Sequence, residues 1–357
     1  MFNLAYMKQI ILDILKAGVR APSGDNSQPW RFEIKDNVIF IYNLPEKDNP
    51  IFNYKQRGSH IAHGALIENI VIAATEKGYK ALVVLFPHGA ESDCVAQVTL
   101  EQTLVVKDPL FSFIFTRAIN RKPYRQVLLS SEQKNSIFET TKEIGSGRII
   151  LVDDMNAVKK LGKDFSINEI VMLENRDLHN YFFSDVRWTD EEEQREKTGL
   201  YAKTMELKPP QLAVFKLLSH WRINTLLCKL GIARFIAKEN AKGYGTGTIG
   251  AIIMEDESPE SYIRAGRIMQ RVWLKAAQMH FGFHPITGVV YMMMRIRDNR
   301  NEVLSDVHVN LLRKAYHDIE AQLGITSGEL TITFRIGDGG EPSGYSSRLE
   351  PRVEYIT

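Results

Sequence analysis

The sequence has few cysteines and no segment suited to export. Only Cys94 and Cys228 are cysteines among the 357 residues. They form neither a disulfide framework nor the paired spacing of a metal site, so we predict no metal. We expect two buried thiols and a reducing compartment, the cytoplasm. The N-terminal stretch contains Lys8 and Asp13 and lacks a small-residue cleavage site, which favours a first helix over a signal peptide.

A strong excess of charge of one sign is also missing. The chain has 45 basic and 43 acidic residues, a net charge of +2, which gives no reason to expect nucleic acid or a membrane surface as partner. The apolar stretch 215–235 contains four basic residues, which exclude a simple membrane span. There is no P-loop, and no GxGxxG leads from a strand into a helix, so a Rossmann dinucleotide site is not predicted.

The composition is that of an ordinary globular protein, and the chain is long enough for one large or two ordinary domains. Residues 186–245 combine an acidic run, a Pro-Pro pair and a glycine-rich end, and we interpret them as an inserted lid.

The mixture of elements predicts an α+β fold. Periodicity and turn signals predict helices at 7–19, 60–78, 109–121, 131–143, 155–178, 259–281 and 303–322, a hairpin at 31–43, and strands at 80–87, 95–106, 148–153, 248–254 and 329–336.

Two of these helices resemble each other. ENIVIAATEKGY and RVWLKAAQMHFGF each place a pair of alanines before a glycine and an aromatic residue, about 200 residues apart, which suggests an internal duplication. Both helices are apolar nearly all round, so we expect them to be buried against each other. We predict two homologous halves, 1–106 and 107–357, with 186–245 as the lid insertion of the second half.

The first motif that could carry chemistry is the loop APSGDNSQPWRF, which follows the first helix. Pro29 is expected to extend Gln28, so that Asn26 and Gln28 point the same way. Their amides offer both donors and acceptors, as the edge of a flat heterocycle requires. From the residues alone, a capped loop built on Ser23 and Asp25 explains the segment better.

The second motif is RAINR, with Arg117 and Arg121 four residues apart. On a helix these guanidiniums would share a face, and forked guanidiniums suit a phosphate. An isolated pair of this kind is more often a solvated basic turn.

Two further segments lie in the last quarter of the chain. The run FRIGDGGEPSGYSSRLEP follows a strand, and its glycines let the backbone approach a ligand closely before Ser347 and Arg348. The run GFHPITG contains Pro285, Thr287 and Gly288. Taken alone, the first is typical of a tail loop and the second of a helix end with a tight turn.

Together the four segments resemble the nitroreductase superfamily, in its APSxxNxQPWxF loop, its Arg-x-Ser-x-Arg/Lys pattern, its GLxxxPxxG segment and its terminal basic residue. Ile119 stands at the serine position, and Glu350 precedes Pro351, so the match is incomplete. The resemblance implies FMN, with Arg117 and Arg348 on the phosphate, Arg121 near the pyrimidine end, and a backbone N–H near Gly288 facing flavin N5. The FMN contacts that it implies are Pro22, Ser23, Gly24, Asn26, Gln28, Arg117, Arg121, Pro285, Thr287, Gly288, Ser347 and Arg348.

The order of the motifs also differs from the usual family chain. The APSxxN loop occurs only in the first half, and the arginine motif, PITG and the terminal arginine occur only in the second. This pattern resembles the Acg-like subfamily of fused nitroreductases, in which a lid lies over the flavin. It implies a self-contained pseudo-dimer of nitroreductase-like fold with one complete FMN site, with further oligomerisation left open.

The function that the resemblance implies is an FMN oxidoreductase. It would pass electrons from NADPH or NADH to a small, flat acceptor of nitroaromatic or quinone type, and it would need no catalytic side chain because the flavin carries the chemistry. Two alternatives stay open: a flavin-sequestering or redox-sensing protein with little turnover, and a flavin dehydrogenase of natural-product assembly.

Overall fold

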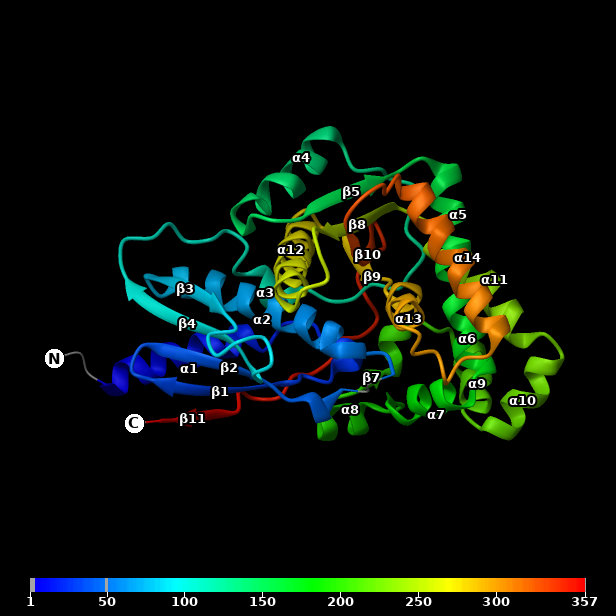
Figure 1. Cartoon of the computed structure of the whole chain (residues 1–357), viewed down its shortest axis with the longest axis horizontal. Coiled ribbons are helices and arrows are strands. Elements are labelled where there is room, and N and C mark those ends of the chain that lie inside the picture. The colour runs from blue at the N-terminus through cyan, green and yellow to red at the C-terminus, as the bar shows by residue number, and fades with distance from the viewer. Residues whose placement is uncertain (1–3, 49–50, 357) are drawn as a thin grey trace.

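The computed structural model describes residues 4–48 and 51–356. Residues 1–3, 49–50 and 357, which fall within the two predicted halves, lie outside the described residues. The chain forms a five-stranded and a four-stranded sheet, both mainly antiparallel, around two central helices, with further helices on one side (Figure 1). The predicted α+β class is confirmed.

The first sheet is built around the predicted hairpin. The strands pair through Ile34 and Ile39, and Asp36 adopts a left-handed φ of 53° in the turn. Side chains alternate between buried and partly exposed along the first strand, as one covered sheet face requires. The elements are α1 (Leu4–Gly18), β1 (Trp30–Lys35), β2 (Val38–Asn43), α2 (Arg57–Glu76), β3 (Tyr79–Leu85) and β4 (Cys94–Gln102).

The second sheet repeats this plan. Its order, β5-β8-β10-β9, places its first, second, fourth and third strands side by side, as β1-β2-β4-β3 does in the first sheet. In both sheets a long helix joins the second strand to the third, which is the arrangement that a duplication would produce. The elements are α4 (Ser131–Thr140), β5 (Arg148–Val152), β8 (Thr248–Met254), α12 (Pro259–Gln278), β9 (Gly282–Pro285) and β10 (Glu329–Gly337).

Helices α2 and α12 cross at the centre of the molecule at a pair of glycines (Figure 1). A Cβ atom on Gly64 would lie 2.0 Å from the carbonyl oxygen of Ile263, and one on Gly266 would lie 2.0 Å from that of Ile61. Only glycine allows the two backbones to approach so closely. The expectation that these two helices pack against each other within one chain is confirmed.

The second half departs from the first through two insertions. The predicted helix at 155–178 is divided at Ser166 and Asn175, and the Asn175 side chain caps the next helix. Between β9 and β10 lie α13 (Gly288–Arg297), which was not predicted, and α14 (Asp306–Leu323). Between β5 and β8 lie α5 (Met155–Phe165), α6 (Ile167–Glu174), α7 (Arg176–Ser184), β6 (Val186–Arg187), α8 (Asp190–Glu196), β7 (Leu200–Tyr201), α9 (Pro209–Leu218), α10 (Trp221–Lys229) and α11 (Ile232–Tyr244).

The prediction of a helix at 109–121 was wrong for most of its length. Only α3 (Phe113–Thr116) is helical, and the chain leaves the helix at Arg117 with ψ 129°. Ile119 then forms a parallel bridge with Phe283 beside β9, which holds the following residues extended. Arg117 and Arg121 therefore do not share a helical face.

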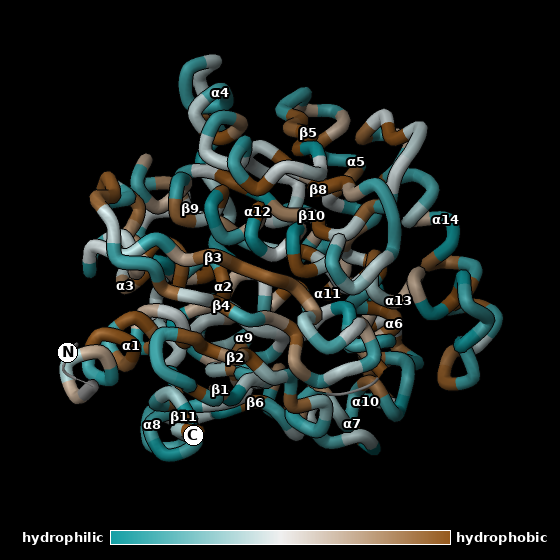
Figure 2. The backbone as a smooth tube through the Cα atoms, turned by 60° about the vertical axis from the view of Figure 1, so that its left-hand side comes forward, coloured by the Kyte–Doolittle hydropathy of each residue, from teal (hydrophilic) through white to brown (hydrophobic). Residues whose placement is uncertain are grey.

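The end of the chain crosses from the second sheet to the first. After β10 an irregular segment leads to β11 (Val353–Tyr355), which pairs in parallel with β1 through Phe32, Glu33 and Ile34. Figure 2 shows hydrophobic stretches gathered in the inner strands and central helices and a hydrophilic α8 on the outside. No helix among the described residues is long and apolar enough to span a membrane.

Candidate functional site

A pocket lies where the first-half loop, the 117–121 segment, the lid insertion and the C-terminal tail converge. It contains about 680 Å³ of empty space, part of it open to solvent. Six of the twelve predicted site residues line it, from segments far apart in the sequence: Pro22, Ser23, Asn26, Arg117, Arg121 and Arg348.

The loop after α1 has an unusual backbone. Asp25, Asn26 and Gln28 all have positive φ, at 44°, 58° and 52°. The extended conformation predicted for Gln28 was therefore wrong, because its backbone N–H donates to the Ser23 hydroxyl at 3.0 Å and folds the loop back on itself. Left-handed non-glycine residues cost free energy, and clusters of them are frequent at binding sites.

The side-chain amides of Asn26 and Gln28 form hydrogen bonds with the insertion between β5 and β8 and with the C-terminal tail. Asn26 Nδ2 donates to the carbonyls of Lys197 and Ser347, both at 3.1 Å, and Gln28 Nε2 donates to Lys197 at 2.7 Å. The Leu349 N–H donates to Gln28 Oε1 at 2.9 Å. Asn26 Oδ1 is buried and accepts no hydrogen bond, so one acceptor at the pocket is left without a partner.

Three arginines meet at one end of the pocket without an acidic partner. Arg20, Arg117 and Arg348 all line it, and none forms an ion pair with any described residue. Burial, together with the charges of Arg348 and Arg20, holds the pKa of Arg117 well below its ordinary value. Burial and the charge of Arg20 lower the pKa of Arg348 to about 10, although the nearby charge of Glu193, which forms no ion pair with it, raises the pKa. Buried, mutually repelling cations of this kind need an anion.

Neutral groups position these arginines. Arg117 Nη2 donates to the Arg20 carbonyl at 2.6 Å, and its guanidinium lies 4.3 Å from the ring centre of Trp273. Arg348 donates to the carbonyls of Ala21, at 3.2 Å, and Ser347, at 3.0 Å. The Nε atoms of Arg20 and Arg117 are buried without a partner. Neutral groups thus hold Arg117 and Arg348 in place, and no ion pair neutralises the cluster.

Residues of the insertion between β5 and β8 form another part of the pocket wall. Arg121 Nη1 donates to the carbonyl and the hydroxyl of Thr204, at 2.9 and 3.1 Å. Burial lowers the pKa of Arg121, while the nearby Tyr244 and Asp25 raise it. Thr204 lines the pocket together with Gly199 and Leu200 of the insertion, so part of the predicted lid forms its wall.

The other six predicted residues do not line this pocket. Gly288 starts α13, where a Cβ atom would lie 2.4 Å from the Asn168 side chain. Ser347 N–H donates to Glu193 at 2.5 Å, in the tail next to Arg348. This set contains Gly24, Gln28, Pro285, Thr287, Gly288 and Ser347.

Sequence reasoning missed several residues of the site. Arg20 stands directly before the APS motif, so its position could have suggested a third basic residue of the site. No sequence signal indicates Trp273, because only the packing of its helix brings it into the pocket. Asp25 also lines the pocket, where burial raises its pKa and Arg121 lowers it.

A buried carboxyl group from the insertion lies near this region. Burial raises the pKa of Glu169 to about 7, and the hydroxyl of Tyr244 donates to its Oε1 at 2.5 Å. Its Oε2 is buried without a partner. Tyr244 is also close enough to Arg121 to affect its pKa, which connects the carboxyl group to the pocket wall.

Comparison with known sequences yields one distant relative. No family model matches the chain. A search of curated proteins finds "Uncharacterized protein MT1398" of Mycobacterium tuberculosis, 21% identical over 339 residues. The match covers 94% of this chain and 46% of that protein, so the chain spans about half the length of the curated relative it matches.

Comparison with solved structures finds nitroreductases. A putative nitroreductase from Anabaena variabilis matches 92% of this chain and 88% of its own, with 9% identity and a TM-score of 0.43. The FMN-dependent nitroreductase NfnB of Mycobacterium smegmatis, solved with NADPH, matches 65% of this chain and 87% of its own, with 11% identity and a TM-score of 0.38. A nitroreductase of Bacteroides fragilis with bound FMN matches 68% and 95%, with 10% identity and a TM-score of 0.34.

Proposed function

We propose that this chain is an FMN-dependent oxidoreductase whose pocket binds the FMN phosphate between Arg20, Arg117 and Arg348. The observation that carries the proposal is the cluster of three guanidiniums, one buried and two partly buried, that form no ion pair with any described residue. A phosphate carries roughly −1.5 to −2 charges and accepts several forked hydrogen bonds. It would therefore neutralise the cluster and satisfy the free Nε atoms of Arg20 and Arg117.

The rest of the pocket suits the flat ring system of FMN. Pro22, Ser23 and Asn26 line one wall, and the free Oδ1 of Asn26 would accept a hydrogen bond from a ring N–H. Arg121 and the lid residue Thr204 form the opposite part of the wall. Bound FMN would supply hydride-transfer chemistry, so the chain's own residues need only hold the ring and exclude water.

We propose NADPH or NADH as the reductant and a small, flat molecule of nitroaromatic or quinone type as the acceptor. The support is the resemblance of the motifs and the NADPH in the structure of one neighbour. Both thiols, Cys94 and Cys228, are free, which suits the proposed cytoplasmic location.

A second candidate is a flavin-storing or redox-sensing protein, and the lid favours it. The carbonyls of Lys197 and Thr204 bind Gln28 and Arg121, so the insertion is tied to the pocket from both sides. Stopped-flow mixing of the FMN-loaded chain with NADPH separates the two candidates. Rapid bleaching of the flavin supports turnover, and no bleaching over minutes supports storage.

The test of the binding site is an FMN titration. Arg348→Ala should weaken FMN binding by roughly 1.5–3 kcal/mol, because a charge-assisted phosphate contact is lost. Arg125→Ala is the matched control, since Arg125 is exposed and lies outside the lining residues. Equal FMN affinity in the two variants would exclude Arg348 as a ligand.

We further propose that one chain, as a fused pseudo-dimer of two halves, holds one FMN. The loop with Asn26 comes from the first half, and Arg117, Arg121 and Arg348 come from the second, so a single chain contains every part of the pocket. Light scattering combined with flavin titration should give one FMN per monomer. Two FMN per chain, or loss of FMN when the protein is diluted to monomer, would contradict the proposal.

A further inference from the structure

The part of the insertion that faces away from the pocket has a one-sided charge. Residues 207–238, which include α9, α10 and most of α11, contain no acidic residue. All six of their basic residues are exposed, and none forms an ion pair with any described residue. We call this surface the basic face, and its cations are Lys208, Lys216, Arg222, Lys229, Arg234 and Lys238.

The same three helices expose large apolar side chains. Leu230, between α10 and α11, is 79% exposed, and Leu226 and Phe235 are 61% and 59% exposed. Val214, Leu217 and Ile223 are also exposed. The opposite sides of these helices carry Leu218 and Ala233, which are buried in a small core of the insertion's own. The exposed residues are thus not needed to hold the helices in place.

This face lies at the edge of the molecule, where α10 projects away from both sheets and from both ends of the chain (Figure 1). Such an edge can meet a flat surface without obstruction from the rest of the fold. Aliphatic and aromatic side chains among unpaired lysines and arginines are typical of protein surfaces that lie in the headgroup region of a membrane. The cations bind acidic headgroups, and the apolar side chains enter the boundary of the acyl chains.

We propose that the basic face binds peripherally to a bilayer that contains anionic phospholipid. Charge complementarity selects this partner. A second copy of the chain would bring two sets of like charges together, and a nucleic acid would leave the apolar side chains without a role. The near-neutral total of the chain gave no sign of a membrane partner, because acidic residues outside the basic face balance its six cations.

The proposal does not depend on flavin binding, and vesicle flotation of the full chain tests it. The probes are phosphatidylcholine vesicles with and without one third phosphatidylglycerol. The wild-type chain should float with the anionic vesicles and far less with the neutral ones. Raising the salt concentration should weaken this binding, because the charges that carry it are exposed.

Two triple variants separate the charged from the apolar contribution. R222E/K229E/R234E should lower the partition coefficient by roughly a hundredfold or more, at about fivefold for each basic residue removed. L226Q/L230Q/F235Q should lower it by about tenfold or more, because apolar area no longer leaves water. The control L104Q/V106Q changes two apolar residues that are 103% and 92% exposed elsewhere, and it should bind like the wild type.

Each variant should keep the far-ultraviolet circular dichroism of the wild type, since all the altered side chains are exposed. No flotation of the wild type, or equal flotation with neutral and anionic vesicles, would overturn the proposal. So would a dimer by light scattering that the apolar variant abolishes while vesicle binding is unchanged, because the face would then join two copies.

Discussion

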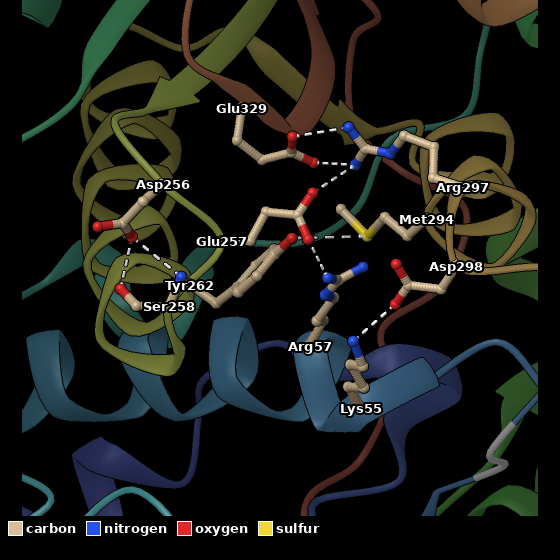
Figure 3. Close-up of polar contacts among 10 residues, drawn as sticks. All are labelled: Lys55, Arg57, Asp256, Glu257, Ser258, Tyr262, Met294, Arg297, Asp298 and Glu329. Carbon is tan, nitrogen blue, oxygen red and sulfur yellow. Dashed lines mark hydrogen bonds and ion pairs between the residues drawn. The ribbon is translucent and has the colours of Figure 1, made fainter.

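Two groups of arginines in this molecule have opposite electrostatic environments. In the first group (Figure 3), Arg57 pairs with Glu257, and Arg297 pairs with both Glu257, at 3.2 Å, and Glu329. Lys55 pairs with Asp298 at 2.6 Å beside them. Burial disfavours the charge of Arg297, but the hydrogen bond and charge of Glu329 outweigh it and raise the pKa of Arg297 above its ordinary value.

In the second group, at the pocket, none of Arg20, Arg117 and Arg348 forms an ion pair with any described residue, and burial lowers the pKa of each. The presence of acidic partners in the first group and their absence in the second indicate different roles. A buried charge needs a counter-charge. The first group finds it within the chain and joins the start of α2 to the loop before α12, the end of α13 and the start of β10, whereas the second leaves a place for an anion. Substitutions of single residues test whether the two groups differ in this way.

The largest effect is expected at Glu68, a buried acid that pairs with two arginines of the facing helix. Glu68 on α2 is buried and binds Arg267, at 2.7 Å, and Arg271, at 2.5 Å, on α12. Burial would raise the pKa of Glu68, but the two arginines hold it below its ordinary value. Glu68→Ala should lower the free energy of unfolding by about 3–5 kcal/mol, because Arg267 loses its ion pair and Arg271 keeps only its pair with Asp108.

Urea unfolding measures this loss, and Glu76→Ala is the control. Glu76 lies on the same helix but pairs with the exposed Lys107, so its removal should cost less than about 1 kcal/mol. Equal losses of unfolding free energy in the two variants would show that the ion pairs of Glu68 do not hold α2 and α12 together.

Much of the fold could be predicted from sequence periodicity. The hairpin, the central helices and three strands of the second sheet follow their hydrophobic patterns, whereas β9 was not predicted; α2 and α12, which resemble each other, hold equivalent places in the two sheets. The helix at 109–121 could not be excluded from local signals, because a bridge between Ile119 and Phe283, more than 160 residues apart, holds the segment extended. Tertiary contacts of this kind leave no periodic signal.

The part of the site that could be predicted from the sequence is its set of arginines, because their positive charges require an anion. Arg117, Arg121 and Arg348 line one pocket as the motifs implied, although not on the expected helix. Gln28 was read as a ligand, but its amide binds Lys197 and Leu349, because an amide can serve a backbone segment as well as a heterocycle. The roles of the predicted residues that do not line the pocket stay predictions.

A smaller effect, with a defined pH dependence, is expected at Glu169. Burial raises its pKa from 4.5 to about 7, so between these values the folded chain binds more protons than the unfolded chain. The stability that this group contributes is present below pH 4.5 and is lost as the pH rises through 7. The charged form should cost roughly 3 kcal/mol above pH 7.

Glu169→Gln removes this titration and keeps the acceptor for the Tyr244 hydroxyl. Urea unfolding at pH 5 and pH 8 should therefore show similar stabilities at pH 5 and a more stable variant at pH 8. Glu239→Gln, on the exposed side of α11, should show no such difference. A variant that is no more stable than wild type at pH 8 would mean that Glu169 is not destabilised by its charge.

The smallest effect on stability is expected at Arg117, although it lies deeper than most arginines, at 8% exposure. Arg117→Met removes a stacking contact with Trp273 and a hydrogen bond to the Arg20 carbonyl, but it also removes repulsion from Arg20 and Arg348. We expect these contributions to offset each other to within about 1 kcal/mol in the chain without ligand.

The same variant should lose most of the rise in melting temperature that FMN produces in the wild type, because the bound phosphate would lack one forked donor. Arg57→Met gives the opposite pattern: Glu257 loses a buried partner, so the free energy of unfolding falls further, while the response to FMN stays that of the wild type. Thermal melts with and without FMN measure both responses. If Arg117→Met destabilised the ligand-free chain as strongly as Arg57→Met and kept the FMN response, the pocket arginines would be structural, and the distinction between the two groups would be lost.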